Sequence, residues 1–310
     1  LELQLIVAGG ALLHKYGNFV EDGHLGEFEV DKKIYFLLEG ENPITMAKST
    51  GIALTEFTSA FENLNPDIVM TIADRFEELA IGAAATFQNI PLAHIEGGEV
   101  SGSVDESIRH AITKISHLHF PSTERAAERV CKLGEPPENV FNVGTPSLDV
   151  ISELDLDDIE TVETKLRDKG VGADIHLNND YLLVIQHPIT TEYKHNRRYI
   201  DETIEAVDEF ERPTVWLWPN MDAGSDAVSK GIRVYREQND QDFIRFFTSL
   251  PLEQYAVLLN NADLIKEAIR NQMDHGPYES SGIYGNGDSG EKIADVLAEF
   301  EFDIQKQITY

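Results

Sequence analysis

Acidic and basic side chains follow two apolar runs of this sequence, at the points where predicted strands end. Asp74 and Arg75 come directly after the run at 67–73, and Glu96 follows the run at 90–95. The residues between these runs are rich in alanine and have helical spacing, so the segment predicts a βαβ unit with parallel strands. Because parallel strands end at the same edge of a sheet, we expect Asp74 and Glu96 to face one site.

The next predicted helix adds another acid and another arginine to this site. Residues 103–106 form a capping-box pattern, and isoleucines recur on one face of the turns that follow. Asp105 and Arg109 are four residues apart, so they share a face of this helix near its N-terminus. Carboxylates interleaved with arginines are suited to proton transfer beside a negatively charged group. The sequence therefore predicts an acid–base site at this edge.

Each of these side chains also has a structural interpretation. A carboxylate after a strand, such as Asp74, is often a turn or cap residue. Glu106 is better explained as the capping partner of Ser103 than as a catalytic group. Asp105 and Arg109 could form a surface ion pair worth only ~0.3 kcal/mol. The functional hypothesis rests on the joint placement of these residues and not on any single one.

Polar residues also follow two predicted strands in the second half of the chain. His187 comes after the first of them, and Asn220 and Ser225 come after the second, where Ser225 begins a helix. Main-chain amides at helix starts suit phosphate groups, although a lone histidine there is often structural. His117 and His119 have the alternating spacing of a strand and no carboxylate near them in sequence, so we expect no metal site.

These positions belong to an alternation of short strands and helices that predicts an α/β protein with parallel sheets. An acidic amphipathic stretch at 151–168 indicates a linker helix between two domains. We expect an N-terminal domain at 1–168, a C-terminal domain at 169–290 and a C-terminal helix at 291–310. Further predicted strands lie at 117–123, 139–147, 181–186 and 214–218, and further helices at 192–210 and 225–236.

The alternation is interrupted near residue 264. Asp263 and Leu264 begin a strand, but helical residues follow at once from Ile265 without a glycine loop. A βαβ unit needs roughly 30 residues, so we expect that a whole unit is missing between Leu264 and Ile265. The first residues alternate like a strand that enters a glycine turn, which indicates a start inside a domain.

The composition excludes several classes of partner. The chain carries 25 Lys and Arg against 55 Asp and Glu, a net charge of −30, which disfavours nucleic acid and anionic membranes. No apolar run approaches the ~20 residues that span a bilayer. The single cysteine, Cys131, cannot close an intrachain disulfide, so we expect a reducing compartment, the cytoplasm. We also hypothesise adaptation to high salt, with ordinary acidic solubility as the alternative.

The stretch HIEGGEVSGSVDESIRHAITKISH, at 94–117, resembles the hydrolysing UDP-N-acetylglucosamine 2-epimerases of sialic-acid pathways. The similarity extends through ADRFEEL at 73–79, QHPITTEYKH at 186–195 and WPNMDAGS at 218–225, and it covers most of the chain. The resemblance implies two Rossmann-like domains in the arrangement of B-type glycosyltransferases, with a UDP-sugar in the central cleft. It also implies a homodimer or homotetramer, and a reaction that needs no nicotinamide or other cofactor.

Matched residue by residue, the resemblance gives roles to the polar positions described above. It makes Asp74, Glu96 and Asp105 the catalytic carboxylates. It places four residues around the sugar and pyrophosphate, namely Arg75, His94, Arg109 and His187, and it counts His187 among the catalytic groups as well. It puts Asn220 and Ser225 in the nucleotide half. The central motif favours the hydrolysing reaction over a non-hydrolysing epimerase or a glycosyltransferase. The implied substrate is UDP-N-acetylglucosamine or a 2,4-diacetamido relative.

Several features of the family are absent from this sequence. The Gly-Asn-Ser-Ser phosphate loop and an Arg-Gln-x-Gly-Arg stretch are missing where the alternation is interrupted, and the early arginine motif would precede Leu1. Ala11 stands where the family has histidine, and Ala73 stands where glycine is usual. If the phosphate loop is a genuine deletion, a non-catalytic nucleotide-sugar-binding protein is the alternative.

Overall fold

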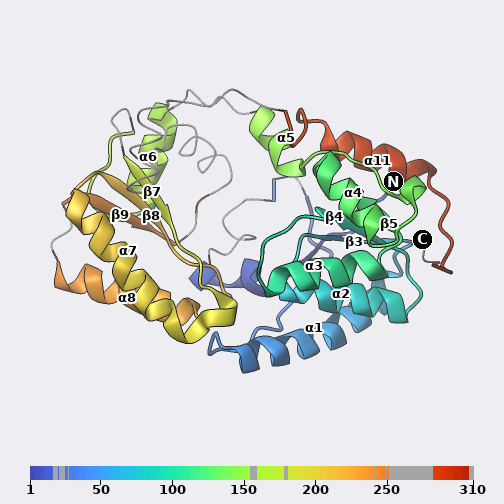
Figure 1. Ribbon diagram of the computed structural model, residues 1–310, viewed down its shortest axis with the longest axis horizontal. Coiled ribbons are helices and arrows are strands. Elements are labelled where there is room, and N and C mark those ends of the chain that lie inside the picture. The colour runs from blue at the N-terminus through green and yellow to red at the C-terminus, as the bar shows by residue number, and fades with distance from the viewer. Residues whose placement is uncertain are drawn as a thin grey trace.

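The computed structural model describes residues 1–16, 20, 25–26, 28–153, 159–177, 181–239, 242–248, 250 and 282–306. Its helices and strands form two α/β lobes, which lie side by side in Figure 1. Every strand pair but one is parallel among these residues, which confirms the predicted fold class. Residues 264–265, where the sequence predicts a missing unit, lie outside the described residues.

The first lobe carries the predicted βαβ unit. Its strands β1 (Ile6–Ala8) and β2 (Lys32–Ile34) form a two-stranded sheet. A second sheet has three strands in the order β3 (Val69–Ile72), β4 (Leu92–Ile95) and β5 (Leu118–Phe120). Its helices are α1 (Pro43–Leu64), α2 (Phe76–Phe87), α3 (Val104–Ile115), α4 (Glu124–Lys132) and α5 (Pro146–Ser152), with 3-10 turns η1 (Gly9–Leu12), η2 (His14–Tyr16) and η3 (Pro137–Asn139). The alanine-rich segment between the two runs forms α2, so the predicted βαβ unit is confirmed as β3–α2–β4.

The second lobe repeats the arrangement around one sheet with the order β6-β9-β8-β7. Its strands are β6 (Val171–Gly172), which is antiparallel to its neighbour, β7 (Leu182–Ile185), β8 (Thr214–Leu217) and β9 (Ile244–Phe247). Its helices are α6 (Ile159–Lys169), α7 (Asn196–Phe210) and α8 (Ser225–Gln238), with the 3-10 turn η4 (Thr190–His195). The helix predicted at 192–210 therefore begins at Asn196, because the backbone at Glu192 is not helical.

The strand predicted at 139–147 is only partly formed, since the Phe141 and Val143 N–H groups donate to the carbonyl oxygens of His119 and Pro121 at 2.9 and 3.3 Å. Val140 forms only an isolated bridge with His119. Gly144 then turns the chain with a φ of +90°, and Pro146 occupies the first position of α5. Since proline at this position favours the start of a helix, an extended strand does not continue through these residues.

Side-chain packing assigns α6 to the second lobe. Val162 and Leu166 on one face of α6 are buried in a core with Val215, Leu217 and Phe247 from β8 and β9. The sequence expectation instead ended the first domain at residue 168. The helix contacts the second sheet because its apolar side chains gain more from burial there than from exposure in a linker.

The C-terminal helix returns to the first lobe. Helix α11 (Ser289–Glu299) packs Ile293 into the core beside β4 and β5, and its first amides donate to the Asp149 carboxylate of α5 at 3.0 and 2.6 Å. Figure 1 shows α5 and α11 together, with both chain ends in this lobe. The helix ends at Glu299, so the expected helix at 291–310 is shorter than predicted, and residues 307–310 lie outside the described residues.

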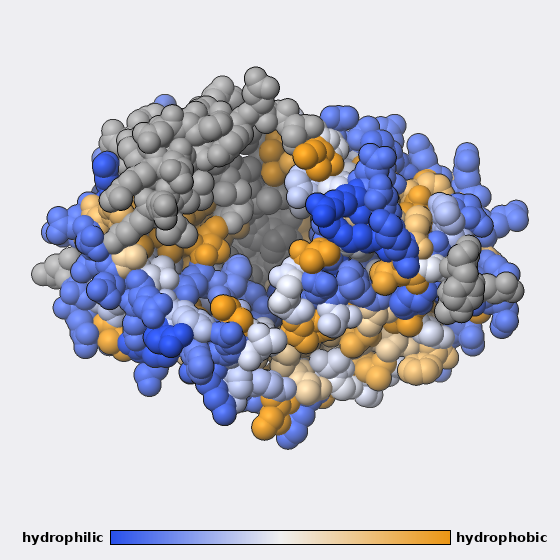
Figure 2. Space-filling model, in the orientation of Figure 1, coloured by the Kyte–Doolittle hydropathy of each residue, from blue (hydrophilic) through white to orange (hydrophobic). Residues whose placement is uncertain are grey.

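None of the helices in the described part of the chain is long and apolar enough to cross a membrane. Figure 2 shows hydrophilic residues over much of the described surface on one face, with single apolar residues between them. This surface agrees with the strongly acidic composition.

Candidate active site

Asp74 and Arg109 form an ion pair at the carboxyl edge of the first-lobe sheet. Asp74 follows β3, whereas Arg109 lies on α3 with only 9% of its surface exposed. Two nitrogens of its guanidinium, Nε and Nη1, are buried without a hydrogen-bond partner among the described residues. Burial raises the pKa of Asp74, and the negative charges of Asp105 and Asp222 add to this effect, although Arg109 opposes it. The site therefore combines a buried cation with a carboxylate that binds protons more readily than usual.

Asp105 approaches the same place from the first turn of α3. Ser103 orients it, because the Ser103 hydroxyl donates to Asp105 Oδ2 at 2.8 Å and accepts from the Asp105 N–H at 3.2 Å. Glu106 points elsewhere and accepts the main-chain N–H groups of Ser101 and Gly102 at 3.1 and 2.7 Å. Glu106 is thus a capping residue, as the structural interpretation holds, but it caps the preceding loop instead of Ser103.

Two tight turns place the acids at the ends of β3 and β4. Ala73 and Glu96 both have a φ of +61°, a left-handed conformation that strains residues other than glycine. Glu96 follows β4 at the predicted edge, and its carboxylate accepts the Thr145 hydroxyl at 2.6 Å. The Glu96 carboxylate is therefore held toward the start of α5.

His94 lies inside the protein, behind these turns. Its side chain is fully buried, Nε2 donates to the Ala73 carbonyl oxygen at 2.8 Å, and Nδ1 contacts the Thr113 hydroxyl at 3.2 Å. Burial lowers the pKa of His94 to about 3, so the ring is neutral. In this position the ring fixes the turn that carries Asp74, and both of its nitrogens have partners inside the first lobe, whereas the resemblance implies a place beside the sugar and pyrophosphate.

Arg75 begins α2 next to Asp74. Its Nε donates to Glu77 at 2.8 Å, and 39% of its side chain stays exposed. Its positive charge lowers the pKa values of His187 and Asp222 in the second lobe. The charge of Arg75 thus affects titratable groups of the second lobe.

His187 and Asn220 meet at the carboxyl edge of the second-lobe sheet, as their positions after β7 and β8 predict. The Asn220 main-chain N–H donates to His187 Nδ1 at 3.2 Å. Because Nδ1 accepts this bond, the neutral ring carries its proton on Nε2. Burial lowers the pKa of His187, while Asp222 raises it and Arg75 lowers it further.

Asp222 is a candidate site residue that the sequence reasoning missed. It follows Asn220 by two positions, and the Asn220 side chain donates to Asp222 Oδ2 at 2.5 Å. The charges of Asp105 and Glu77 raise the pKa of Asp222, in addition to burial, and the charge of Arg75 lowers it. The sequence did offer a signal for this residue, because Asp222 is an acid that lies two positions after Asn220, beyond the end of a predicted strand.

Ser225 lies at the contact between the lobes and is only 2% exposed. Burial raises the pKa of the Tyr16 hydroxyl of the first lobe, the Ser225 side chain opposes this rise, and the hydroxyl donates to Glu41 at 2.9 Å. The neighbouring Gly224 N–H donates to the Glu41 carbonyl oxygen at 2.8 Å. The start of α8 is thus occupied by the first lobe in this structure, whereas the resemblance places Ser225 against the nucleotide.

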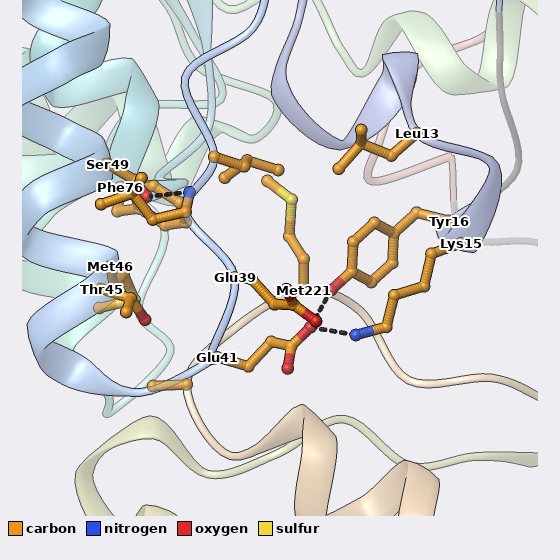
Figure 3. A pocket seen from close by; sticks show the side chains of 13 residues that line it. Leu13, Lys15, Tyr16, Glu39, Glu41, Thr45, Met46, Ser49, Phe76 and Met221 are labelled. Atoms are coloured by element: carbon orange, nitrogen blue, oxygen red, sulfur yellow. Dashed lines mark hydrogen bonds and ion pairs between the residues drawn. The ribbon is translucent and has the colours of Figure 1, made fainter.

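A pocket of about 250 Å³ opens beside this contact. Figure 3 shows Lys15 and Tyr16 directed at Glu41, with Met221 at the centre of the view. Phe76 and Met221 line the pocket. Phe76 directly follows Arg75 in the chain, and Met221 directly precedes Asp222. The pocket therefore lies against main chain that continues to Arg75 and to Asp222.

Within the described ranges, no group of three His, Cys, Asp or Glu residues could hold a metal ion. His119 has a carboxylate partner that sequence distance concealed, because its Nε2 lies 3.0 Å from Glu135 and both side chains are fully buried. His117 Nδ1 accepts the Leu92 N–H at 3.2 Å. Both histidines serve the packing of the first lobe.

The chain matches known proteins over most of its length. The family model described as UDP-N-acetylglucosamine 2-epimerase matches residues 1–267. The chain is 33% identical over 265 residues to the hydrolysing UDP-N,N'-diacetylbacillosamine 2-epimerase of Legionella pneumophila, which covers 86% of this chain and 68% of that protein. It is 29% identical over 290 residues to the hydrolysing GDP/UDP-N,N'-diacetylbacillosamine 2-epimerase of Campylobacter jejuni. This match covers 93% of this chain and 73% of that protein.

Solved structures share the fold. The UDP-GlcNAc 2-epimerase of Neisseria meningitidis, whose structure contains UDP-GlcNAc, superposes with a TM-score of 0.72 at 15% identity, over 92% of this chain and 90% of that one. This similarity supports the predicted arrangement of two Rossmann-like domains.

Proposed function

This chain belongs to the UDP-N-acetylglucosamine 2-epimerase family, and we propose that it is a hydrolysing 2-epimerase, which converts a UDP-2-acetamido sugar into UDP and the free 2-epimeric sugar. The two relatives described above are both named as hydrolysing enzymes. The observation that carries the proposal is the Asp74–Arg109 ion pair beside Asp105, since it places carboxylates and a buried cation at one point.

The reaction explains why acids and arginines occur together. The proton on carbon 2 of the sugar is not acidified by a carbonyl group, so its removal is coupled to the departure of UDP from carbon 1. A carboxylate takes the proton while positive charge stabilises the leaving pyrophosphate. Asp74 has the raised pKa of a suitable base, and Arg75 and Arg109 supply the positive charge.

The second half of the reaction hydrates the resulting glycal. Water adds at carbon 1 and a proton adds at carbon 2 from the opposite face, so a base for water and a further acid are required. Glu96 and Asp105 are the first-lobe carboxylates available to accept a proton from water. His187 donates from Nε2 to a phosphate oxygen, because its Nδ1 is already engaged by Asn220. Carbon 2 ends at its original oxidation level, and no nicotinamide is needed.

The substrate class follows from the relatives. A structure from Methanocaldococcus jannaschii contains UDP-GlcNAc and UDP, and the two relatives above act on a diacetylated sugar nucleotide by name. We therefore propose UDP-N-acetylglucosamine or a 2,4-diacetamido relative as substrate. Family membership supports a homodimer or homotetramer, and the single cysteine fits the cytoplasm.

An isotope experiment tests this function. UDP-N-acetylglucosamine is incubated with the protein in deuterium oxide without added NAD. Free UDP and an N-acetylmannosamine-type sugar with deuterium at carbon 2 are expected. A product that keeps the substrate hydrogen at carbon 2 contradicts elimination, whereas a UDP-linked product identifies a non-hydrolysing epimerase.

A further inference from the structure

The Glu96 carboxylate is held by a single hydroxyl group among the described residues. The Thr145 hydroxyl donates to Glu96 Oε1 at 2.6 Å, although the two residues are 49 positions apart in the chain. The second carboxylate oxygen, Oε2, has no hydrogen-bond donor within the described part of the chain. One oxygen is therefore fixed, and the other is left to accept a proton.

The main chain at Glu96 is constrained as well. Its φ of +61° is a conformation that strains residues other than glycine, and its N–H donates to the Phe120 carbonyl oxygen of β5 at 2.9 Å. Such strain persists where the surrounding contacts determine the backbone. The side-chain torsions of Glu96 are the freedom that remains, and the bond to Thr145 restricts them.

The Thr145 hydroxyl makes this contact instead of capping its own helix. Thr145 is the N-cap of α5, a position where a threonine oxygen commonly accepts a main-chain N–H of the first turn. Its side chain makes no such bond. By contrast Thr123, the N-cap of α4, accepts the Ala126 N–H at 3.1 Å. The usual function of an N-cap threonine therefore does not explain the orientation of the Thr145 hydroxyl.

The C-terminal part of the chain holds Thr145 in this place. The Thr145 N–H donates to the Tyr284 carbonyl oxygen at 2.9 Å, and a Cβ on the preceding Gly144 would lie only 2.8 Å from that oxygen. Farther along α5, Asp149 accepts the first two amides of α11 at 3.0 and 2.6 Å. The two helices lie together in Figure 1. These contacts anchor the start of α5, and with it the hydroxyl that meets Glu96.

We propose that Thr145 is a positioning residue for Glu96, which acts on the reaction through the orientation of the Glu96 carboxylate. This inference rests on the proposed function, in which Glu96 is one of the carboxylates available to accept a proton from water. The acceptor oxygen must lie within hydrogen-bond reach of that proton, and a misplacement of ~1 Å can cost about 100-fold in rate. A hydroxyl that fixes one oxygen of the carboxylate limits such misplacement of the other.

Thr145→Val and Thr145→Ser test this role, because valine has nearly the shape of threonine without the hydroxyl and serine keeps the hydroxyl. The measurement is steady-state formation of the free sugar from UDP-N-acetylglucosamine. For Thr145→Val we expect kcat to fall by ~10- to 100-fold and KM to stay within about 3-fold, and for Thr145→Ser we expect kcat within about 3-fold of wild type. Normal kcat in Thr145→Val, or Thr145→Ser as slow as Thr145→Val, overturns the proposal.

Thr123→Val is the matched control, since it removes the same hydroxyl from the N-cap of another helix. The Thr123 hydroxyl also donates to Glu99 at 3.2 Å, an acid without a part in the proposed reaction. This variant should lower Tm by about 2–4 °C through the lost cap and keep kcat within about 3-fold of wild type. A loss of kcat as large as that of Thr145→Val would attribute both losses to destabilised helix starts and overturn the proposal.

A double variant shows whether Thr145 acts through Glu96. In the Glu96→Gln background, Thr145→Val should lower the residual kcat by no more than about 2-fold, because no carboxylate is left to orient. A further loss as large as in the wild-type background overturns the proposal, and so does a wild-type kcat in Glu96→Gln alone. A wild-type protein that forms no free sugar instead contradicts the proposed function itself.

Discussion

The Gly224 N–H donates a hydrogen bond of 2.8 Å to the carbonyl oxygen of Glu41, and this bond joins the two lobes directly. The Tyr16 hydroxyl reinforces the contact, because it donates to the Glu41 carboxylate at 2.9 Å. Residues from the N-terminal region, from the start of α1 and from the start of α8 therefore meet at one point. This contact ties the start of α8 to the first lobe.

Tyr16→Phe should destabilise the protein. The substitution removes a hydrogen bond to a charged carboxylate, which typically contributes ~1.5–3 kcal/mol. We expect Tm to fall by about 3–6 °C in scanning calorimetry. Tyr35→Phe is the matched control, since Tyr35 is 64% exposed and its change should leave Tm unaltered. Equal Tm values for the two variants would show that the Tyr16 hydroxyl does not stabilise the lobe contact.

Asp105→Asn and Glu96→Gln should each lower turnover of UDP-N-acetylglucosamine by at least ~100-fold, the usual scale for an acid–base group. Binding of UDP, measured by calorimetry, should persist because the arginines remain. Near-normal turnover in either variant would return that residue to a cap or turn role.

Glu106→Gln is the control for these acid substitutions. Its carboxylate serves the amides of Ser101 and Gly102, so turnover should stay within about 3-fold of wild type. A loss as large as that of Asp105→Asn would place Glu106 in the chemistry.

Glu135 should make stability depend on pH in the acid range. It is 1% exposed and bonds to His119 at 3.0 Å, Lys114 at 2.5 Å and Lys306 at 2.6 Å. Burial alone would raise the pKa of Glu135, but these three partners lower it to about 2, from 4.5 for an exposed glutamate. A lowered pKa in the folded state means that the ionised carboxylate stabilises the fold.

This stabilisation should be complete above pH 4.5 and lost as the pH falls toward 2. The difference in free energy of unfolding between wild type and Glu135→Gln, from denaturant titrations, should therefore shrink over that interval. Glu138→Gln, an exposed neighbour, should show no such trend. A difference that does not change with pH would refute the assigned network.

Salt should stabilise the protein if its net charge of −30 reflects salt adaptation. The Debye length falls from ~30 Å at 0.01 M to ~3 Å at 1 M, so salt relieves repulsion within the chain and between protein and UDP-sugar. Between 0.05 and 2 M KCl we expect Tm to rise and KM to fall, about monotonically. A flat or falling Tm would favour ordinary acidic solubility.

Local patterns in the sequence determined the elements and the edge of the sheet at which Asp74 and Glu96 lie. The alternation at 67–95 encodes β3, α2 and β4, because periodicity of apolar residues depends only on neighbours along the chain. The same reasoning placed Asp74 and Glu96 at one sheet edge and Arg109 on α3. These positions follow from element type alone, and no knowledge of packing is needed.

Only the tertiary structure decided which of these side chains pair with residues far away in the chain and which are enclosed. His94 reads as a site residue in sequence, but it is buried against Ala73, 21 positions away. His119 pairs with Glu135, and Met221 of the second lobe inserts into the apolar core of the first. Such pairings depend on how whole elements and lobes pack, since the free energy comes from contacts between residues far apart in the chain, which no local pattern records.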